Sequence, residues 1–439
     1  MLDQTYEGSN KSFMALRVYL ALMVLIEPLV PSTFVHVFLS SITGSEASSS
    51  LPFKCSLRNG DSGICVVVDQ CPFVHSGLML QKLATGRLPE RIVEKPTVCN
   101  FDFYSGEAYV CCRVSSFMCG RYRKRKQHLV KQRRESNNQS DIERIESARS
   151  VGLGSPDTSL QTNKSNKTCP GNPEFRPLIV NGIPAEPNEF PHMVAVGKYL
   201  DGKGLSFVCG GSLISEQWVL TAAHCFIDDL NFVRIGDGVQ EDHNVFDATR
   251  DFYITKYEIH PGYFAMKHGK YYDLALIRLS EDLGGPLQFS TSVFPGCLSQ
   301  FPPNLITEEV QIIGWGLTAP YGHKSRTLLK TSVPLLNDTE CSDIIRNNNL
   351  LQRNYKKGAG HGVICALDQE GGSDACQGDS GGPMNMLDED TCTYDIVGIV
   401  SKGVGCGSRI FPGLYSDVYY HLSWIERIVW PVDDILSQI

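Results

Sequence analysis

The sequence predicts a mainly β protein with two antiparallel barrels packed together, a C-terminal helix and a small disulfide-rich module in front. From Ile179 to Ile439, short apolar runs alternate with turns rich in Gly, Pro and Asn, as in an all-β domain. The segment from His421 to Trp430 instead has the apolar periodicity of a helix. Six of the 16 cysteines lie between Cys55 and Cys112. A chain of 439 residues has room for about two or three such domains.

The cysteine content and the N-terminal segment predict a secreted, extracellular protein. An even total of 16 cysteines suits disulfides formed in an oxidising compartment. Lys11 and Arg17 precede an apolar run from Val18 to Ile26, which has the length of a signal-peptide core. Pro28 then interrupts the apolar sequence, so a signal anchor, which needs about 20 uninterrupted apolar residues, is the weaker interpretation. We expect residues 1–50 to hold the signal region and no membrane span to remain after its removal.

Residues 113–168 read as a basic, polar linker, because they contain few apolar residues and many Ser, Asn, Lys and Arg. The basic run from Arg121 to Arg134 could bind a polyanion or be a processing site, but a solvated charged segment is the preferred interpretation. The net charge of −8 gives no signal for nucleic-acid binding. Asn-x-Ser/Thr sequences predict N-glycans at Asn138, Asn163, Asn166 and Asn337.

Two motifs carry the strongest chemical signal. The segment Asp374 to Pro383 reads DACQGDSGGP, and the segment Thr221 to Cys225 reads TAAHC. A serine hydroxyl becomes a good nucleophile only when a base takes its proton, so Ser380 and His224 form a candidate pair. The glycines around Ser380 let backbone N–H groups converge on one point, as an oxyanion hole requires.

A third residue, Asp273, stands directly before an apolar run that predicts a buried strand. A carboxylate there would hold the imidazole tautomer and stabilise the imidazolium. The chain order His224, Asp273, Ser380 resembles the chymotrypsin-type serine proteases and differs from that of subtilisins and α/β-hydrolases. The resemblance implies a chymotrypsin-like double β-barrel, serine endopeptidase activity without a cofactor, and oxyanion donors at Gly378 and Ser380. A mere turn or a catalytically inactive homologue is disfavoured, because all three residues are present.

The same resemblance implies a trypsin-like specificity pocket. Asp374 stands where the family places the pocket floor, so Arg or Lys is favoured before the scissile bond, since a neutral side chain would leave the carboxylate unpaired. Ala375 lacks a hydroxyl that some relatives use to hold lysine, so we expect arginine to be preferred. Lys402 replaces the usual aromatic residue, which should weaken apolar selection and favour acidic residues two or four positions before the cut. The remaining pocket residues are expected to be Ser401, Gly403 and Gly413.

The six N-terminal cysteines follow the pattern C-x9-C-x5-C-x27-C-x11-C-C. Sequence alone leaves their pairing open, but so short a segment cannot bury a large core and needs disulfides. The spacing and the closing Cys-Cys pair resemble a clip domain, here residues 55–112, of the kind that precedes chymotrypsin-type proteases in arthropods. The resemblance implies the pairs Cys55–Cys111, Cys65–Cys99 and Cys71–Cys112.

Family resemblance also implies disulfides for the rest of the chain. The bridge Cys169–Cys297 would keep the clip portion attached after activation. The two cysteines left over, Cys119 and Cys392, are expected to pair with each other, with two free thiols as the alternative. The other implied bridges are Cys209–Cys225, Cys341–Cys365 and Cys376–Cys406.

The segment beginning Ile179-Val180 resembles the new N-terminus that these proteases expose on activation, so residues 169–178 form the activation segment and 179–439 the protease domain. The freed ammonium of Ile179 would pair with Asp379, because a buried charge needs a partner. Most relatives carry Arg or Lys before this bond, where this chain has Leu178. An enzyme with Asp374 in its pocket should not accept leucine, so we expect a chymotrypsin- or elastase-like activator.

Acidic residues abound from Asp237 to Asp247, so a calcium site is an alternative, but they do not match the trypsin calcium loop, and a chain without a bound metal ion is the preferred interpretation. The chain resembles the snake-type clip-protease zymogens of arthropod cascades. That resemblance implies a downstream protease zymogen as substrate, a serpin-type inhibitor, and a role in developmental or innate immune signalling. The alternatives are a non-enzymatic cofactor and a digestive trypsin, and the clip domain and long linker disfavour the second.

Overall fold

The computed structural model divides the chain into two units, one of residues up to 117 together with 431–439 and one of residues 118–430. The structure describes residues 53–57, 59–67, 70–71, 97–102, 107–150, 182–200, 204–228, 230–236, 247, 250–265, 271–280, 287–303, 309–318, 322–370, 374–388, 393–403 and 406–438. The signal region, the activation segment with Leu178 and Ile179, and the cysteines Cys169 and Cys392 lie outside these residues.

Four short strands form an antiparallel sheet in the first unit, in the order β1-β2-β4-β3. They are β1 (Phe53–Ser56), β2 (Ser62–Val67), β3 (Thr97–Asp102) and β4 (Glu107–Arg113). Such a small sheet buries little apolar surface, so covalent links supply much of its stability. Its three disulfides have the pairing that the clip-domain resemblance implies, namely Cys55–Cys111, Cys65–Cys99 and Cys71–Cys112.

Helix α10 (Val432–Leu436) belongs to this first unit, whereas we expected the protease domain to run to Ile439. It contacts β1 and β2 and buries Val432 and Ile435. Lys54 also forms an exposed ion pair with Asp433 at 3.0 Å, but exposed pairs contribute little. Burial of the two apolar side chains is therefore the main reason why the end of the chain joins this unit.

Six strands of the second unit close into an antiparallel barrel, in the order β10-β11-β8-β7-β6-β9, with β9 pairing back to β10. Their interior is apolar, and side chains such as Leu213, Phe232 and Leu276 are fully buried. Each large apolar side chain buried in this way stabilises the fold by roughly 1.5–3 kcal/mol. The strands are β6 (Met193–Leu200), β7 (Gly204–Leu213), β8 (Trp218–Thr221), β9 (Phe232–Ile235), β10 (Asp251–Ile259) and β11 (Ala275–Leu279).

Eight strands form the second sheet, in the order β15-β18-β17-β16-β13-β14-β5, with β12 beside β17. One bridge between Leu335 and Ala366 joins the end of β14 to β15, so this half closes less completely than the first barrel. The predicted chymotrypsin-like, mainly β fold is confirmed. The strands are β5 (Ile183–Pro184), β12 (Cys297–Leu298), β13 (Glu309–Gly314), β14 (Leu329–Pro334), β15 (Val363–Ala366), β16 (Pro383–Asp388), β17 (Thr393–Lys402) and β18 (Gly413–Asp417).

Short helices lie outside the sheets: α6 (Pro261–Ala265), α7 (Asp338–Asn347), α8 (Asn349–Asn354) and α9 (Val418–Val429). Helix α9 begins before His421, where we expected its start, because the Asp417 side chain caps it by accepting from the Tyr420 N–H. Asn337 caps α7 through Oδ1, and a glycan would attach through Nδ2, so the cap leaves that prediction open. Of the other predicted glycan sites, Asn163 and Asn166 are not described, and Asn138 lies in helix α5 without a described side chain.

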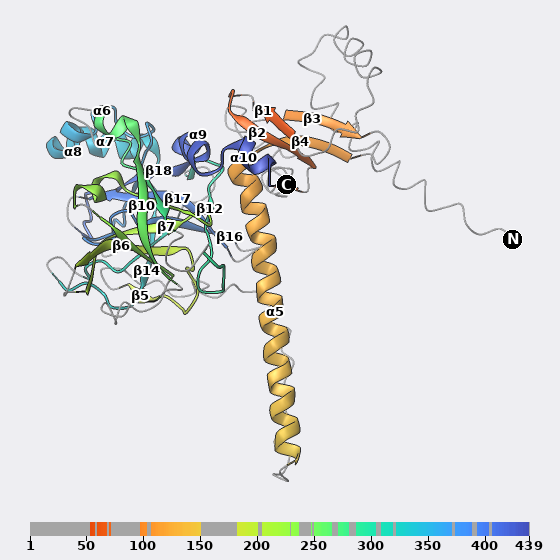
Figure 1. Cartoon of the computed structure of the whole chain (residues 1–439). Helices are drawn as coiled ribbons and strands as arrows, with labels where there is room; N and C mark the ends of the chain where they lie inside the picture. The colour runs from red at the N-terminus through yellow and green to blue at the C-terminus, as the bar shows by residue number, and fades with distance from the viewer. Residues whose placement is uncertain are drawn as a thin grey trace, which may run out of the picture. The chain divides into compact units, whose positions relative to one another are not determined.

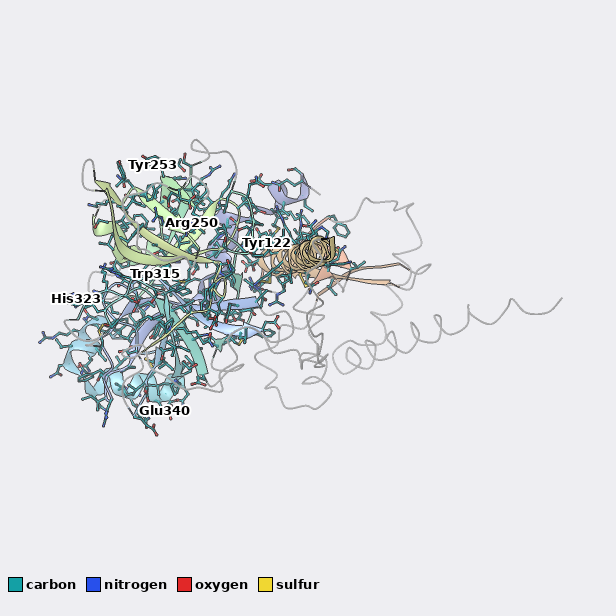
Figure 2. All side chains as sticks on the ribbon, turned by 90° about the horizontal axis from the view of Figure 1, so that it is seen from below. Tyr122, Arg250, Tyr253, Trp315, His323 and Glu340 are labelled. Atoms are coloured by element: carbon teal, nitrogen blue, oxygen red, sulfur yellow. A yellow bond between two sulfur atoms is a disulfide. The ribbon has the colours of Figure 1, made fainter. Side chains whose placement is uncertain are left out.

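The expected linker is helical where the structure describes it, since α5 runs from Val114 to Ser150 (Figure 1). The first turns of the part of α5 that belongs to the second unit, from Met118 onward, pack on the sheets of that unit. Tyr122, which projects from α5 in Figure 2, donates from its hydroxyl to Glu216 at 2.9 Å and meets Phe289 edge-on. Arg123 lies 3.0 Å from both Asp388 and Asp395. The sequence analysis missed this contact because the composition of the whole segment is polar, whereas only a few side chains on one face of the helix form the contact.

The disulfides of the second unit correct two predicted pairs. Cys297 is bonded to Cys119 in α5 and not to Cys169, and the same bond excludes the predicted pair Cys119–Cys392. The helical anchor explains the choice, because it carries Cys119 to Cys297 with a Cα–Cα distance of 5.3 Å, within the range that a disulfide can bridge. The other three bridges occur as the resemblance implied: Cys209–Cys225, Cys341–Cys365 and Cys376–Cys406.

The revised pairing makes a chemical prediction. Cys119→Ser should free the thiol of Cys297, whereas Cys169→Ser should leave Cys297 bonded, because a disulfide needs its own partner. Alkylation of the denatured, unreduced variants followed by peptide mass analysis measures which cysteine is free. An alkylated Cys297 in Cys169→Ser would contradict the pairing.

Candidate active site

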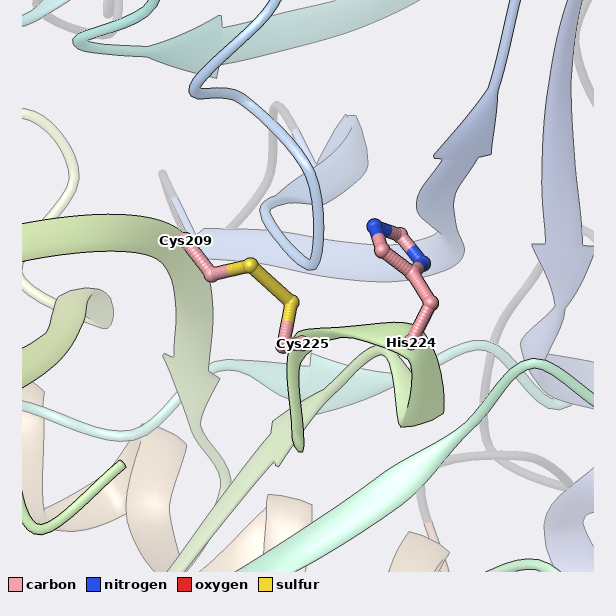
Figure 3. A group of neighbouring side chains, drawn as sticks. All are labelled: Cys209, His224 and Cys225. Atoms are coloured by element: carbon pink, nitrogen blue, oxygen red, sulfur yellow. A yellow bond between two sulfur atoms is a disulfide. The ribbon is translucent and has the colours of Figure 1, made fainter. Parts of the chain in front are cut away.

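His224 lies in the short 3-10 helix Ala223–Asp228, directly after strand β8. The disulfide Cys209–Cys225 links this turn to β7. Figure 3 shows this disulfide next to the side chain of His224. The His224 ring nitrogen Nδ1 lies 2.8 Å from Asp273 Oδ2, and its backbone N–H donates to Asp273 Oδ1 at 2.8 Å. The imidazole is thus held at two points by one carboxylate, and Nε2 is left for another partner.

Asp273 is 1% exposed, yet both of its carboxylate oxygens accept hydrogen bonds. Besides His224, the Ser401 hydroxyl donates to Oδ2 at 2.5 Å, and the Ser416 hydroxyl donates to the Asp273 carbonyl at 3.0 Å. Burial by itself would raise the pKa of Asp273, but the hydrogen bonds from His224 and Ser401 outweigh it and hold the pKa below its ordinary value. The group therefore stays ionised at neutral pH. Sequence analysis placed Ser401 in the pocket and missed this contact, for which the motif carries no signal.

Ser380 is held in a tight loop whose glycines are required by close packing. Its carbonyl accepts from the Gly210 N–H at 2.7 Å, which joins the loop to β7. Gly381 has a φ of 79°, and a Cβ there would lie 2.2 Å from Thr221 Oγ1. Gly378 has a φ of 102°, which side chains rarely adopt. The repeated glycines of the motif thus let the loop reach the first barrel closely.

A cavity of about 220 Å³ brings most of the predicted site residues together. Asp374 is 5% exposed and accepts from the Gly407 N–H at 3.2 Å. Burial raises the pKa of Asp374 to about 7, although backbone N–H groups from Gly407 and Ala375 oppose the shift. A Cβ at Gly413 would lie 2.9 Å from the Asp374 carboxylate, so only glycine leaves that oxygen open to the cavity. The predicted residues that line the cavity are His224, Asp374, Ala375, Ser380, Ser401, Lys402, Gly403 and Gly413.

Asp379, next to Ser380, lies buried outside this cavity. Its two carboxylate oxygens accept from the Gly316 N–H at 2.7 Å and the Cys376 N–H at 2.8 Å. A Cβ at Gly314 or Gly316 would overlap it, so glycines make room for the group. Burial raises the pKa of Asp379 to about 6, because two N–H donors compensate a buried charge only partly. Ile179, its expected partner, lies outside the described residues.

Potential metal ligands in the described residues do not make a site. Two groups come close together, Cys209, His224 and Cys225 in one and Cys119, Cys297 and Asp395 in the other. All four cysteines are in disulfides, and a disulfide sulfur is not a thiolate ligand. Of the acidic segment considered for calcium, Asp247 is described, and its carboxylate binds the Arg250 guanidinium at 2.9 Å.

None of the helices in the described part of the chain combines the length and the apolar character that crossing a membrane requires.

Comparison with known proteins agrees with this geometry. The family model described as trypsin matches residues 179–425. The chain is 33% identical over 269 residues to the clotting factor G beta subunit of Tachypleus tridentatus, covering 58% of this chain and 82% of that protein. It is 36% identical to the serine proteases snk and Hayan of Drosophila melanogaster, again over 58% of this chain, but covers only 57% and 39% of those proteins. The chain therefore belongs to the trypsin family, as its motifs predicted, and is a serine endopeptidase.

Proposed function

We propose that this chain is the zymogen of a secreted endopeptidase that cuts after arginine in an extracellular proteolytic cascade. The observation that carries the proposal is the buried Asp374 carboxylate in the cavity that Ser380 and His224 also line. A cationic side chain that enters this cavity would meet a carboxylate that forms no ion pair with any side chain in the described part of the chain. A buried pair of that kind discriminates strongly against neutral side chains, which leave the charge uncompensated.

The proposed chemistry gives each group one role. His224 Nε2 takes the proton of the Ser380 hydroxyl as the oxygen attacks the carbonyl carbon of the substrate, and later gives it to the leaving amine. Asp273 stabilises the imidazolium through the Nδ1 contact of 2.8 Å. The N–H groups of Gly378 and Ser380 stabilise the oxyanion of the tetrahedral intermediate. In the second half of the reaction, water attacks the carbonyl carbon of the acyl group on Ser380. His224 takes the proton of the water and gives it to the Ser380 oxygen as the acyl group leaves.

Activation by cleavage between Leu178 and Ile179 supplies a cation in direct contact with Asp379, whose charge Lys324 compensates only from a distance. The new ammonium of Ile179 binds the buried carboxylate, which already accepts two backbone N–H groups. This ion pair orders the adjoining loop with Gly378 and Ser380, because a buried charge is stable only with its partner. The Cys119–Cys297 disulfide keeps the part of the chain before the cut attached to the protease domain.

The partners are inferred from chemistry and from the names of relatives. A pocket for arginine fits a downstream zymogen with a basic activation site as substrate, and Leu178 calls for an upstream activator with an apolar pocket. The name of one relative, a clotting factor subunit, supports a place in a protease cascade, where a serpin-type inhibitor would limit activity. The disulfides found throughout the described residues support secretion, since they form in oxidising compartments.

Replacing the pocket carboxylate tests specificity. Asp374→Ser should lower kcat/KM for arginyl peptides by roughly 10²- to 10³-fold, because breaking a buried ion pair costs about 3–5 kcal/mol. Hydrolysis of arginyl p-nitroanilide peptides measures the effect. Labelling of Ser380 with a fluorophosphonate, which carries no basic group, is the control and should persist. Undiminished arginyl hydrolysis would remove Asp374 from the proposal.

The raised pKa of Asp374 predicts pH-dependent binding of cations. Benzamidine, an aromatic amidinium, binds the ionised carboxylate, so its affinity should fall about tenfold per pH unit below pH 7, where the group takes up a proton. Fluorescence or calorimetric titration of the activated enzyme from pH 5 to 8 measures this, and His224→Ala should show the same profile. A flat profile would exclude the assignment.

Because the pKa is higher in the fold than in the unfolded chain, ionisation of Asp374 lowers stability as the pH rises through about 7.

Controlled cleavage tests the zymogen and the enzyme together. The purified chain is incubated alone, with trypsin and with a chymotrypsin-like protease, and the products are sequenced and labelled with a fluorophosphonate. We expect a free Ile179 and labelling of Ser380 only with the chymotrypsin-like protease, since Leu178 suits an apolar pocket. Leu178→Arg should transfer the response to trypsin. Cleavage at Ile179 without labelling of Ser380 would favour a non-enzymatic cofactor.

A further inference from the structure

Tyr272, the residue before Asp273, has a left-handed backbone conformation with a φ of 59°. Among the described non-glycine residues, only Asn188 shares a positive φ, at 65°. Asparagine tolerates this region, whereas a bulky side chain adopts it rarely, because its Cβ crowds the backbone. Such a conformation persists only where its surroundings hold it, and it occurs preferentially near functional sites.

The unusual conformation directly precedes a sharp turn centred on Asp273. The Leu274 N–H donates to the Tyr272 carbonyl at 2.8 Å, two residues back, which closes a three-residue turn. The Leu274 carbonyl in turn accepts from the His260 N–H at 3.0 Å. The turn therefore sets the direction in which the Asp273 side chain leaves the backbone toward His224.

The ring of Tyr272 is confined by its neighbours. It stacks on the ring of His260, with centroids 4.9 Å apart and planes at 16°, and it meets His421 edge-on at 5.5 Å. Gly262 makes room for it, since a Cβ there would lie 2.6 Å from the Tyr272 ring. His260 is itself fixed, because its Nδ1 accepts from the Gly262 N–H at 3.1 Å and its ring packs on Trp424.

The two histidines around Tyr272 behave as neutral rings. Burial lowers the pKa of His260 to about 4, with a smaller contribution from the charge of Arg427. Burial likewise lowers the pKa of His421 to about 3, helped by the nearby His260. At neutral pH both rings are uncharged, so they pack against Tyr272 as ordinary aromatic groups.

We propose that Tyr272 is a positioning residue for Asp273: its ring, held by His260 and His421, maintains the left-handed backbone that aims the carboxylate at His224. The inference rests on the proposed catalytic role of Asp273, which accepts from both the backbone N–H and the Nδ1 of His224. Tyr272 does not line the cavity with Ser380, so it acts on catalysis only through Asp273. Both its ring and its backbone conformation contribute to that role.

A matched pair of variants tests the proposal. Tyr272→Val and Asn188→Val both force a β-branched residue into a left-handed conformation, but only the first adjoins Asp273. With concentrations set by active-site titration, Tyr272→Val should lose about a hundredfold in kcat at nearly unchanged KM, as a small misplacement of a catalytic group does. The acid limb of its pH–rate profile should move to lower pH, because a displaced carboxylate stabilises the imidazolium less.

Two further variants separate positioning from stability. Asn188→Val should lower the melting temperature and leave the pH–rate profile unchanged, and Tyr272→Phe, which keeps the ring, should match the wild-type enzyme. If Tyr272→Val does not fold, Tyr272→Ala, which removes the ring and rarely adopts a positive φ by itself, should still show a lower kcat and the shifted limb. A wild-type profile in the folded Tyr272 variant, or an equal shift in Asn188→Val, would overturn the inference. An inactive wild-type enzyme after activation would instead overturn the proposed function.

Discussion

The buried carboxylate of Asp273 is the constraint on which the rest of the site depends. It accepts from His224, which the first barrel carries, and from the Ser401 hydroxyl on β17 of the second sheet. Its carbonyl accepts from Ser416 on β18. An ionised group so deeply buried is tolerated only when its oxygens are satisfied. The two halves of the protease unit must therefore meet with the accuracy of these hydrogen bonds, which in turn place His224 in the lining of the cavity.

Glycine supplies the close contact that brings the nucleophile to the same point. The Gly210 N–H of β7 donates to the Ser380 carbonyl, and a Cβ at Gly210 would lie 2.9 Å from the Cα of Gly382. Two backbones this close exclude side chains. The Ser380 loop, at the start of β16 in the second sheet, is thereby packed against the strand whose Cys209 is bonded to Cys225, beside His224.

Three buried aspartates in this region differ in how their charge is satisfied. Asp273 has enough donors to keep its pKa low, whereas burial raises the pKa of Asp374 to about 7 and of Asp379 to about 6. A carboxylate that the fold satisfies only partly is poised to bind a cation. We connect Asp374 with the arginine of a substrate and Asp379 with the ammonium that activation releases. The fold thus holds two buried carboxylates of the kind that the proposed pocket and the proposed activation require.

The sequence by itself determined the double-barrel fold class, the family and most of the residues that line the cavity, because short motifs with obligatory glycines and fixed neighbours carry that information locally. Tertiary structure alone decided the partner of Cys297, the anchor made by Tyr122 and Arg123, and the contact of Ser401 with Asp273. It also decided the left-handed turn at Tyr272, whose supporting rings come from distant parts of the chain. These features depend on which side chains meet in space, and a disulfide, an ion pair or a ring contact leaves no periodic pattern in the sequence from which its partner can be read.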